Sequence, residues 1–252
     1  MRRPFIAGNW KLHKTVAEAL ELVNSLKNEL ADIADADIVV APAFTALGQV
    51  AAALAGSNIT VAAQNCYPEK SGAFTGEVSP SLLKDVGCRH GIVGHSERRQ
   101  IFGETNAFIN AKVRALVAEG MTAIFCIGET LEEREGGRMF DVLKRQVSEG
   151  LKGLDAATMA SVVVAYEPVW AIGTGKTASD EQAQEAHAFI RSLLHAQFGE
   201  KIATATRILY GGSVKPDNVD GLMAMPDIDG TLVGGASLKA ADFVRIVHFR
   251  RS

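Results

Sequence analysis

Cysteine is scarce in this chain, which has only Cys66, Cys88 and Cys126 among its 252 residues. An odd number at wide spacing does not fit a disulfide framework or a zinc ribbon, and it favours a reducing compartment. Apolar runs long enough to cross a bilayer are also lacking. The short apolar stretch after residues 1–4 does not have the form of a secretory signal. We therefore expect a cytoplasmic protein without a membrane partner.

A strong excess of one charge is lacking as well. The formal net charge is −3, and the chain has 22% charged and 47% hydrophobic residues, as ordinary soluble globular proteins do. This balance gives no reason to expect nucleic acid as a partner. The length allows one large α/β domain with a substantial core, or two small domains.

Motifs for metals and nucleotides are absent or broken. His187 and His195 are too far apart to bind one metal ion from adjacent helical turns, and no HExxH pattern occurs. The Gly-Lys-Thr sequence at 175–177 resembles the end of a P-loop, but Trp170 stands where that motif needs a glycine. Gly173 comes too late after its strand to begin a dinucleotide fingerprint. The sequence therefore predicts neither a metal nor a cofactor.

Short apolar runs alternate with longer amphipathic segments along the whole chain. The predicted strands are 5–10, 38–41, 59–63, 91–94, 123–127, 162–166, 207–210 and 231–233, and the predicted helices include 16–30, 106–118, 138–151 and 180–197. Capping boxes mark three helix starts, at Thr15 with Glu18, Thr130 with Glu133, and Ser179 with Gln182.

This strict alternation predicts a parallel sheet with right-handed crossovers. Eight such units in roughly 250 residues match a closed (β/α)8 barrel. A doubly wound sheet of similar size is the alternative. Because no linker or change of composition divides the chain, we expect a single α/β barrel domain over residues 1–252.

Polar residues or glycines follow most of the predicted strands. They are Asn9 and Lys11, Gln64 and Asn65, His95 and Ser96, Gly128 and Glu129, Glu167, and the glycine pairs at 211–212 and 234–235. In a barrel all of these strand ends lie on one face, where the active site is built. Any one of them is ordinary turn chemistry, but so many in phase favour a functional face.

The segment 161–176 carries the most information. Its apolar, β-branched run at 162–166 is typical of a strand buried on both faces, and the run ends at Glu167. Pro168 keeps Glu167 out of the helical region and limits where the carboxylate points. The loop that follows has two glycine hinges and three large apolar side chains, as a lid has. A carboxylate beneath such a lid suits acid–base chemistry from which water must be excluded, although a surface glutamate is the simpler interpretation.

Asn9 and Lys11 close the first strand. On the rim of a barrel the ammonium group of Lys11 would point at an anionic substrate, although a lysine here is more often a solvated charge. His95 closes the fourth strand, and residues 96–99 open a helix directly after it. The positive end of a helix disfavours imidazolium, so we expect a neutral ring that acts as a hydrogen-bond donor.

The last two strands are followed by the glycine pairs at 211–212 and 234–235. Glycine lets backbone N–H groups approach an oxyanion closely, and this is the recurring phosphate site of (β/α)8 enzymes.

The long loop at 65–79 also needs an explanation, because long loops are uncommon in compact domains. Phe74 at its glycine-flanked tip predicts insertion into a pocket on another subunit.

With these motifs assembled, the chain resembles the triosephosphate isomerases over its whole length. The resemblance is carried by residues 8–11, 94–99, 165–176, 210–213 and 232–236, and also by 72–77 and 126–129. It implies a TIM barrel that interconverts dihydroxyacetone phosphate and glyceraldehyde 3-phosphate through an enediolate, in glycolysis and gluconeogenesis, without cofactor or metal. Leu12 and His13 depart from the commonest family pattern, at positions that are not catalytic.

The resemblance also implies a role for each site residue. Glu167 would move the carbon-bound proton, and neutral His95 would polarise the carbonyl group and shuttle protons between the oxygens. Lys11 would supply positive charge, Asn9 a further polar contact, and Glu97 would orient this group.

The resemblance further implies a phosphate site and a partner. Backbone N–H groups would hold the phosphate, those of Gly173, Ser213, Gly234 and Gly235. The partner would be a second copy of the chain, in a homodimer formed through loop 65–79, with Thr75 near the substrate site of the other subunit.

Two rival functions stay open at this point. A sugar-phosphate aldolase would need a Schiff-base lysine or a metal cluster, and Lys11 is the only candidate for that lysine. A non-catalytic binding protein on the same scaffold would be expected to lose Glu167 or His95, and both are present.

Overall fold

The computed structural model describes residues 2–172 and 177–250. In this part of the chain eight parallel strands close into a barrel in sequence order. The strands are β1 (Phe5–Asn9), β2 (Asp37–Ala41), β3 (Ile59–Ala63), β4 (His90–Val93), β5 (Thr122–Ile127), β6 (Val162–Tyr166), β7 (Ile208–Tyr210) and β8 (Gly230–Val233). The predicted single-domain (β/α)8 barrel is confirmed. The domain bounds, residues 1–252, stay a prediction.

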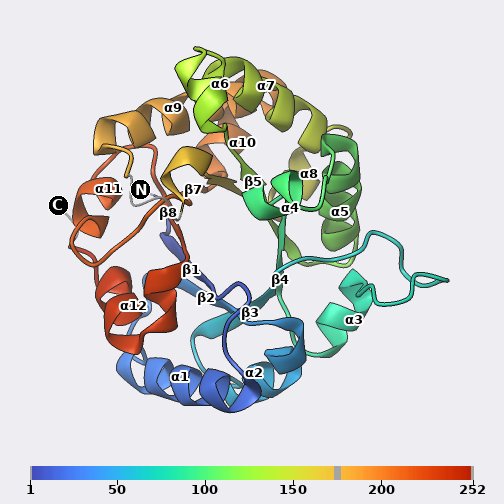
Figure 1. Ribbon diagram of the computed structural model, residues 1–252, viewed down its shortest axis with the longest axis vertical. Coiled ribbons are helices and arrows are strands. Elements are labelled where there is room, and N and C mark those ends of the chain that lie inside the picture. The colour runs from blue at the N-terminus through green and yellow to red at the C-terminus, as the bar shows by residue number, and fades with distance from the viewer. Residues whose placement is uncertain (1, 173–176, 251–252) are drawn as a thin grey trace.

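Helices surround the barrel on its outside (Figure 1). The longer ones are α1 (Val16–Glu29), α2 (Leu47–Ala53), α5 (Asn106–Ala118), α7 (Met139–Gly150), α9 (Asp180–Phe198) and α12 (Ala240–Val247). Shorter α-helices are α3 (Pro80–Asp85), α4 (Ser96–Gln100), α6 (Leu131–Glu135), α8 (Ala156–Met159), α10 (Glu200–Ala205) and α11 (Val219–Met223), and the 3-10 turns are η1 (Phe44–Ala46), η2 (Val169–Ala171) and η3 (Gly235–Leu238). The capping boxes at Thr15, Thr130 and Ser179 are confirmed.

The predicted boundaries need small corrections. β1 ends at Asn9 rather than at residue 10, because the chain turns sharply at Lys11, whose φ is 51°. A further capping box at Asp155 with Thr158 begins α8, which the sequence argument did not identify.

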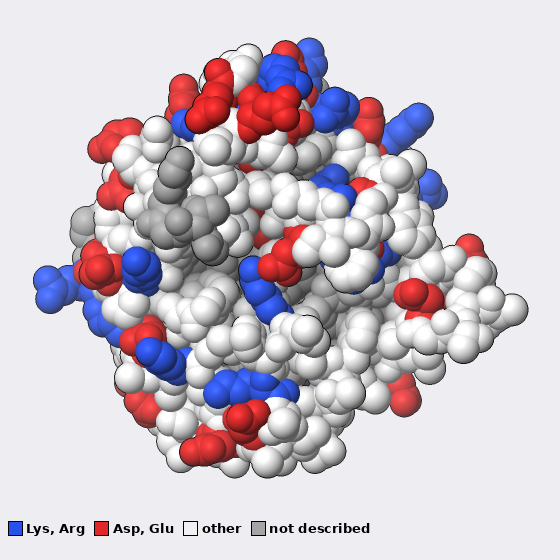
Figure 2. All heavy atoms as spheres, in the orientation of Figure 1, with Lys and Arg blue, Asp and Glu red and all other residues white. Residues whose placement is uncertain are grey.

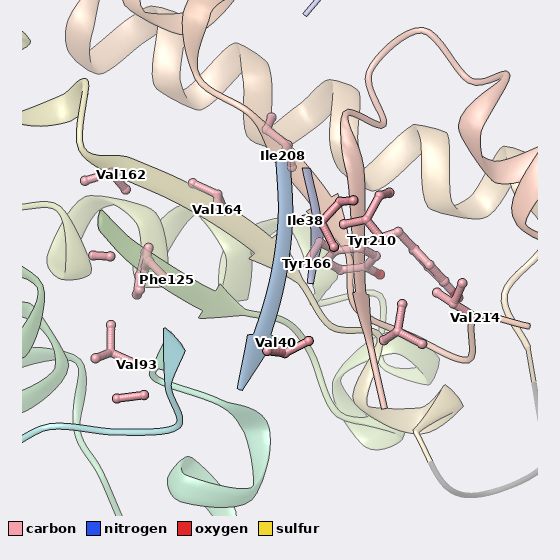
Figure 3. Packing of buried hydrophobic residues seen from close by; sticks show 14 of the residues in the cluster. Ile38, Val40, Val93, Phe125, Val162, Val164, Tyr166, Ile208, Tyr210 and Val214 are labelled. Carbon is pink, nitrogen blue, oxygen red and sulfur yellow. The ribbon is translucent and has the colours of Figure 1, made fainter. Parts of the chain in front are cut away.

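Apolar side chains of the strands alternate between two cores. One set fills the barrel, for example Phe5, Ala7, Ile124 and Cys126. The other packs against the helices, and Figure 3 shows part of it. Strands buried on both faces carry nearly continuous apolar runs, which is the pattern seen in the sequence. Burial raises the pKa of the Cys126 thiol well above its usual range, so this cysteine is a packing residue, as expected.

The carboxyl ends of the strands meet on the face seen in Figure 1. Figure 2 shows this face, with Lys and Arg side chains interspersed among Asp and Glu side chains around a hollow near its centre. The loop between β3 and α3 extends far out from the barrel (Figure 1). The fold therefore gathers the polar strand ends around one hollow and sends one loop away from it.

Candidate active site

Glu167 directly follows β6 and is almost completely buried, with 2% of its surface exposed. Its Oε1 lies 2.9 Å from Nε2 of His95, and its Oε2 accepts a hydrogen bond from the backbone N–H of Ser96 at 2.8 Å. A buried carboxylate is held at two points, by a histidine ring and by the amino terminus of α4. This arrangement suits proton transfer to a group placed beside it.

His95 is the residue that caps α4, as the sequence argument expected. Its Nδ1 accepts a hydrogen bond from the backbone N–H of Glu97 at 3.2 Å. A nitrogen that accepts carries no proton, so this bond favours the neutral ring with its proton on Nε2, directed at Glu167. The carboxylate of Glu97, 3.4 Å from Nδ1, favours the charged ring instead.

The pKa of His95 differs from the sequence-based expectation. Burial lowers the pKa of His95, but the charge and hydrogen bond of Glu167, together with Glu97, raise it more, so that it lies above the usual value of 6.5. The helix terminus alone predicts the opposite direction. This rise in the pKa of His95 has no local sequence signal, because Glu167 follows another strand.

Lys11 and Glu97 form an ion pair beside His95, with 2.6 Å between Nζ and Oε1. Burial works to raise the pKa of Glu97, but the hydrogen bond from Lys11 and the nearby charges leave it below its usual value. The backbone N–H of Lys11 donates to Oδ1 of Asn9 at 3.1 Å. Lys11 has a positive φ of 51°, a conformation that is costly outside glycine and that gathers at functional sites.

Lys11, His95 and Glu167 line one cavity of about 310 Å³. Its walls include Asn9, Lys11, His95, Glu167, Ile172, Gly211, Gly212, Ser213, Gly234 and Gly235. A Cβ added to Gly235 would meet nothing within 4 Å, so its backbone faces open space. The 3-10 turn η3 begins at Gly235, and free N–H groups at the start of such a turn attract anions.

Gly173, also predicted to bind phosphate, lies outside the described residues, and so do residues 174–176 of the predicted lid. Two residues of the site were named from the sequence only as strand-end residues, without their contacts to Glu167. Ser96 contributes a backbone N–H, and the signal was present, since the first N–H groups of a helix are free. Gly211 passes close to Glu167, because a Cβ there would lie 2.9 Å from its Cγ. No local pattern reveals that proximity.

Within residues 2–172 and 177–250, no group of three or more His, Cys, Asp or Glu side chains is placed to hold a metal ion. In the same part of the chain, none of the helices combines the length and the apolar character that a membrane crossing requires.

The chain is similar to known proteins over nearly its whole length. A sequence model of the triosephosphate isomerases matches residues 4–250. The chain belongs to the triosephosphate isomerase family. It is 70% identical over 250 residues to the triosephosphate isomerase of Syntrophotalea carbinolica and 60% identical to that of Pelobacter propionicus, and each match covers at least 99% of both chains.

A solved structure in this family has the same fold. The crystal structure of triosephosphate isomerase from Bartonella henselae superposes with a TM-score of 0.88 at 40% identity, covering 98% of this chain and 99% of that one. A triosephosphate isomerase is an enzyme that interconverts dihydroxyacetone phosphate and glyceraldehyde 3-phosphate, and it acts in cytoplasmic glycolysis. Family membership thereby decides against the aldolase and the non-catalytic binding protein.

Proposed function

We propose that Glu167 is the catalytic base of this isomerase and that His95 is its electrophile. One observation carries the proposal: Oε1 of Glu167 lies 2.9 Å from Nε2 of His95. Both side chains line the cavity that Lys11 also lines. Glu167 removes a proton from the carbon beside the carbonyl group. With substrate bound, Nε2 of His95 donates its hydrogen bond to the carbonyl oxygen instead of to Glu167, and Lys11 offsets the negative charge that develops there.

The reaction is balanced by proton movements alone. Glu167 returns the proton to the neighbouring carbon, while His95 moves a proton between the two oxygens, so that no oxidant or reductant is required. Asn9 fixes the turn at Lys11 through its 3.1 Å hydrogen bond. Glu97 orients Lys11 and the His95 ring, which it contacts from opposite carboxylate oxygens.

The phosphate group of the substrate belongs on the wall of the cavity that is formed by the segments after β7 and β8. The N–H groups of Ser213, Gly234 and Gly235 support this assignment, because they come from adjacent strand ends and Gly235 borders open space. Gly173 belongs to the same proposal from the family motif alone. Anchoring the phosphate there leaves the carbon atoms of a triose between Glu167, His95 and Lys11.

The role of Glu167 as the base can be tested by replacing it with a shorter carboxylic acid. Glu167→Asp keeps the charge but withdraws the carboxylate by about one ångström, and a misplacement of that size can lower kcat on the order of 100-fold. Turnover is followed in a coupled isomerase assay with a strong chelator present, and binding of a phosphate-bearing inhibitor serves as the control for an intact site. Wild-type turnover by this variant would show that Glu167 is not the base.

We further propose that two copies of the chain form a homodimer through loop 65–79. Large apolar side chains are exposed in the segments that follow β1 to β4, namely Leu12, Phe44, Phe74, Leu82, Val86, Ile101 and Phe102. Exposed apolar side chains gathered on consecutive segments are typical of an interface. In the proposed dimer, Thr75 on the same exposed loop would lie near the substrate site of the second copy, as the family motif implies.

The base of this loop is well held, which supports a docking role rather than a loose one. The backbone N–H of Tyr67 donates to the carbonyl oxygen of Val78 at 2.8 Å. Buried Lys112 donates to Oδ1 of Asn65 at 2.8 Å. A rigid stem with an exposed Phe74 loses little entropy when it inserts into a partner.

A further inference from the structure

Strands β4 and β5 separate at their carboxyl ends, and the base lies beside the gap. Their pairing ends at Val93 with Phe125, because the chain turns away at Gly94, whose φ is 72°. On its other side β5 continues to bond the segment after β6. Glu167 N–H donates to the carbonyl of Ile127 at 2.7 Å, and the next such bond runs from Val169 to Glu129 at 3.1 Å.

Two side chains occupy the place that β4 leaves. Nη2 of Arg99 donates to the carbonyl of Cys126 at 3.0 Å, and its Nε donates to Gly94 at 2.7 Å. Gln146, from α7, binds the peptide groups of Gly128 with both ends of its amide. The Gly128 N–H donates to Oε1 at 2.8 Å, and Nε2 donates to the Gly128 carbonyl at 3.1 Å. One donor and one acceptor are what a neighbouring strand would offer.

Gly128 in turn lies directly against the main chain of Glu167. A Cβ added to Gly128 would overlap the carbonyl oxygen of Glu167 and lie 2.7 Å from its carbonyl carbon. The two backbones are therefore in contact with no side chain between them. A shift of the Gly128 peptide is passed to Glu167 without being absorbed by a flexible group.

Packing alone does not hold this position. A cavity of about 420 Å³ opens on the same side, and its walls include Ser96, Arg99, Gln146, Gly128 and Glu167. The hydrogen bonds of Gln146, whose exposed fraction is only 7%, cross that gap. Without them the Gly128 peptide would have space to move and two buried groups without partners.

We propose that Gln146 is a positioning residue for the catalytic base. Its amide replaces the missing strand beside Gly128 and thereby fixes the main chain of Glu167 at the distance that proton transfer requires. This inference rests on the proposed role of Glu167 as the base. The alternative is that Gln146 only anchors α7 to the barrel and affects stability without affecting the chemical step.

The first experiment replaces Gln146 by a side chain of similar length that makes neither hydrogen bond. Gln146→Met lowers kcat roughly 10- to 100-fold, because Glu167 is displaced by a fraction of an ångström or more. KM changes less than about twofold, since the phosphate is held by the strands on the other side of the barrel. Asn110→Leu is the matched control, because Asn110 also binds two backbone carbonyls, of Gly150 and Lys152, away from the site.

A double-mutant cycle separates positioning from anchoring. In the Glu167→Asp background the base is already withdrawn, so adding Gln146→Met lowers kcat less than about threefold. A loss as large as in the wild-type background would overturn the proposal, and so would a wild-type kcat for Gln146→Met. If Glu167→Asp alone turned over normally, the role of Glu167 would fail instead, and the two failures are thus distinguishable.

A second variant keeps the test open if Gln146→Met does not fold. In Gln146→Glu the carboxylate accepts from the Gly128 N–H but cannot donate to its carbonyl, whereas the protonated acid can do both. Its kcat relative to wild type at the same pH therefore rises as the pH falls from 8 to 6. A ratio that does not change with pH would contradict the positioning role.

Discussion

At the residue scale, the contact between His95 and Glu167 couples the protonation of the two groups. Burial alone lowers the pKa of His95, and Glu167 is the main group that raises it. In Glu167→Gln the burial remains but the charge is gone, so we expect the pKa of His95 to fall below 6.5. NMR titration of the ring nitrogens measures it, with Glu97→Gln as the control that removes the weaker contact at 3.4 Å. An unchanged pKa in Glu167→Gln would mean that the carboxylate does not control the ring.

The sequence identified the strand-end residues of the site because a barrel collects all strand ends on one face. Asn9, Lys11, His95 and Glu167 line one cavity although they come from three different strands. The direction of the His95 pKa was not predictable in this way. It depends on a carboxylate 72 positions further along the chain, at a distance that only the closed barrel fixes. The role of Gln146 was not predictable either, because a glutamine in an amphipathic helix carries no local sign that it binds Gly128 after another strand.

At the scale of elements, alternation and capping predicted the eight strands and the helices α1, α5, α7 and α9 within one or two residues. Short elements such as α3 and α8 have too few residues for a periodic pattern, although the start of α4 was expected at residues 96–99. The gap between β4 and β5 was also beyond prediction, because a glycine after a strand does not by itself reveal that the chain turns away there, as it does at Gly94 with a φ of 72°.

The loop between β3 and α3 gives a prediction at this scale. Phe74 is 40% exposed, and Phe140 on α7 is 41% exposed, so the two form a matched pair. We expect Phe74→Ser to weaken self-association at least tenfold, because an apolar side chain buried between subunits contributes about 1.5–3 kcal/mol. Phe140→Ser should leave self-association unchanged. Sedimentation over a range of concentrations measures both, and equal behaviour of the two variants would remove loop 65–79 from the interface.

At the scale of the whole molecule, the described cysteines are all free and buried. Because no disulfide links the described residues, the barrel is held by noncovalent interactions alone. Its resistance to acid then depends on its buried ionisable groups. His187 on α9 is completely buried. Its ring packs edge-on against Tyr166 at 5.5 Å, and Nδ1 lies 2.7 Å from the carbonyl of Ala183. Burial lowers the pKa of His187 from 6.5 to about 4.

The lowered pKa of His187 determines whether acid stabilises or destabilises the folded protein through this residue. Between about pH 6.5 and pH 4 the unfolded chain binds a proton at His187 that the folded protein does not bind, so the free energy of unfolding falls as the pH falls. Between pH 7 and pH 5 the loss from this residue is about 2 kcal/mol. His95 acts in the opposite sense, because its pKa is raised, and its stabilisation is lost as the pH rises through its folded pKa.

The contribution of His187 can be isolated by urea unfolding at pH 7 and pH 5 at one fixed protein concentration. In His187→Phe the ring contact with Tyr166 is kept but the titrating group is gone, so the difference between the two pH values shrinks by about 2 kcal/mol. His95 is present in both proteins, and its effect cancels. His195→Phe on the same helix is the matched control, because His195 is exposed, and it should keep the wild-type difference. If His187→Phe kept that difference too, acid would destabilise the barrel through its other ionisable groups, and a neutral buried His187 would have no part in it.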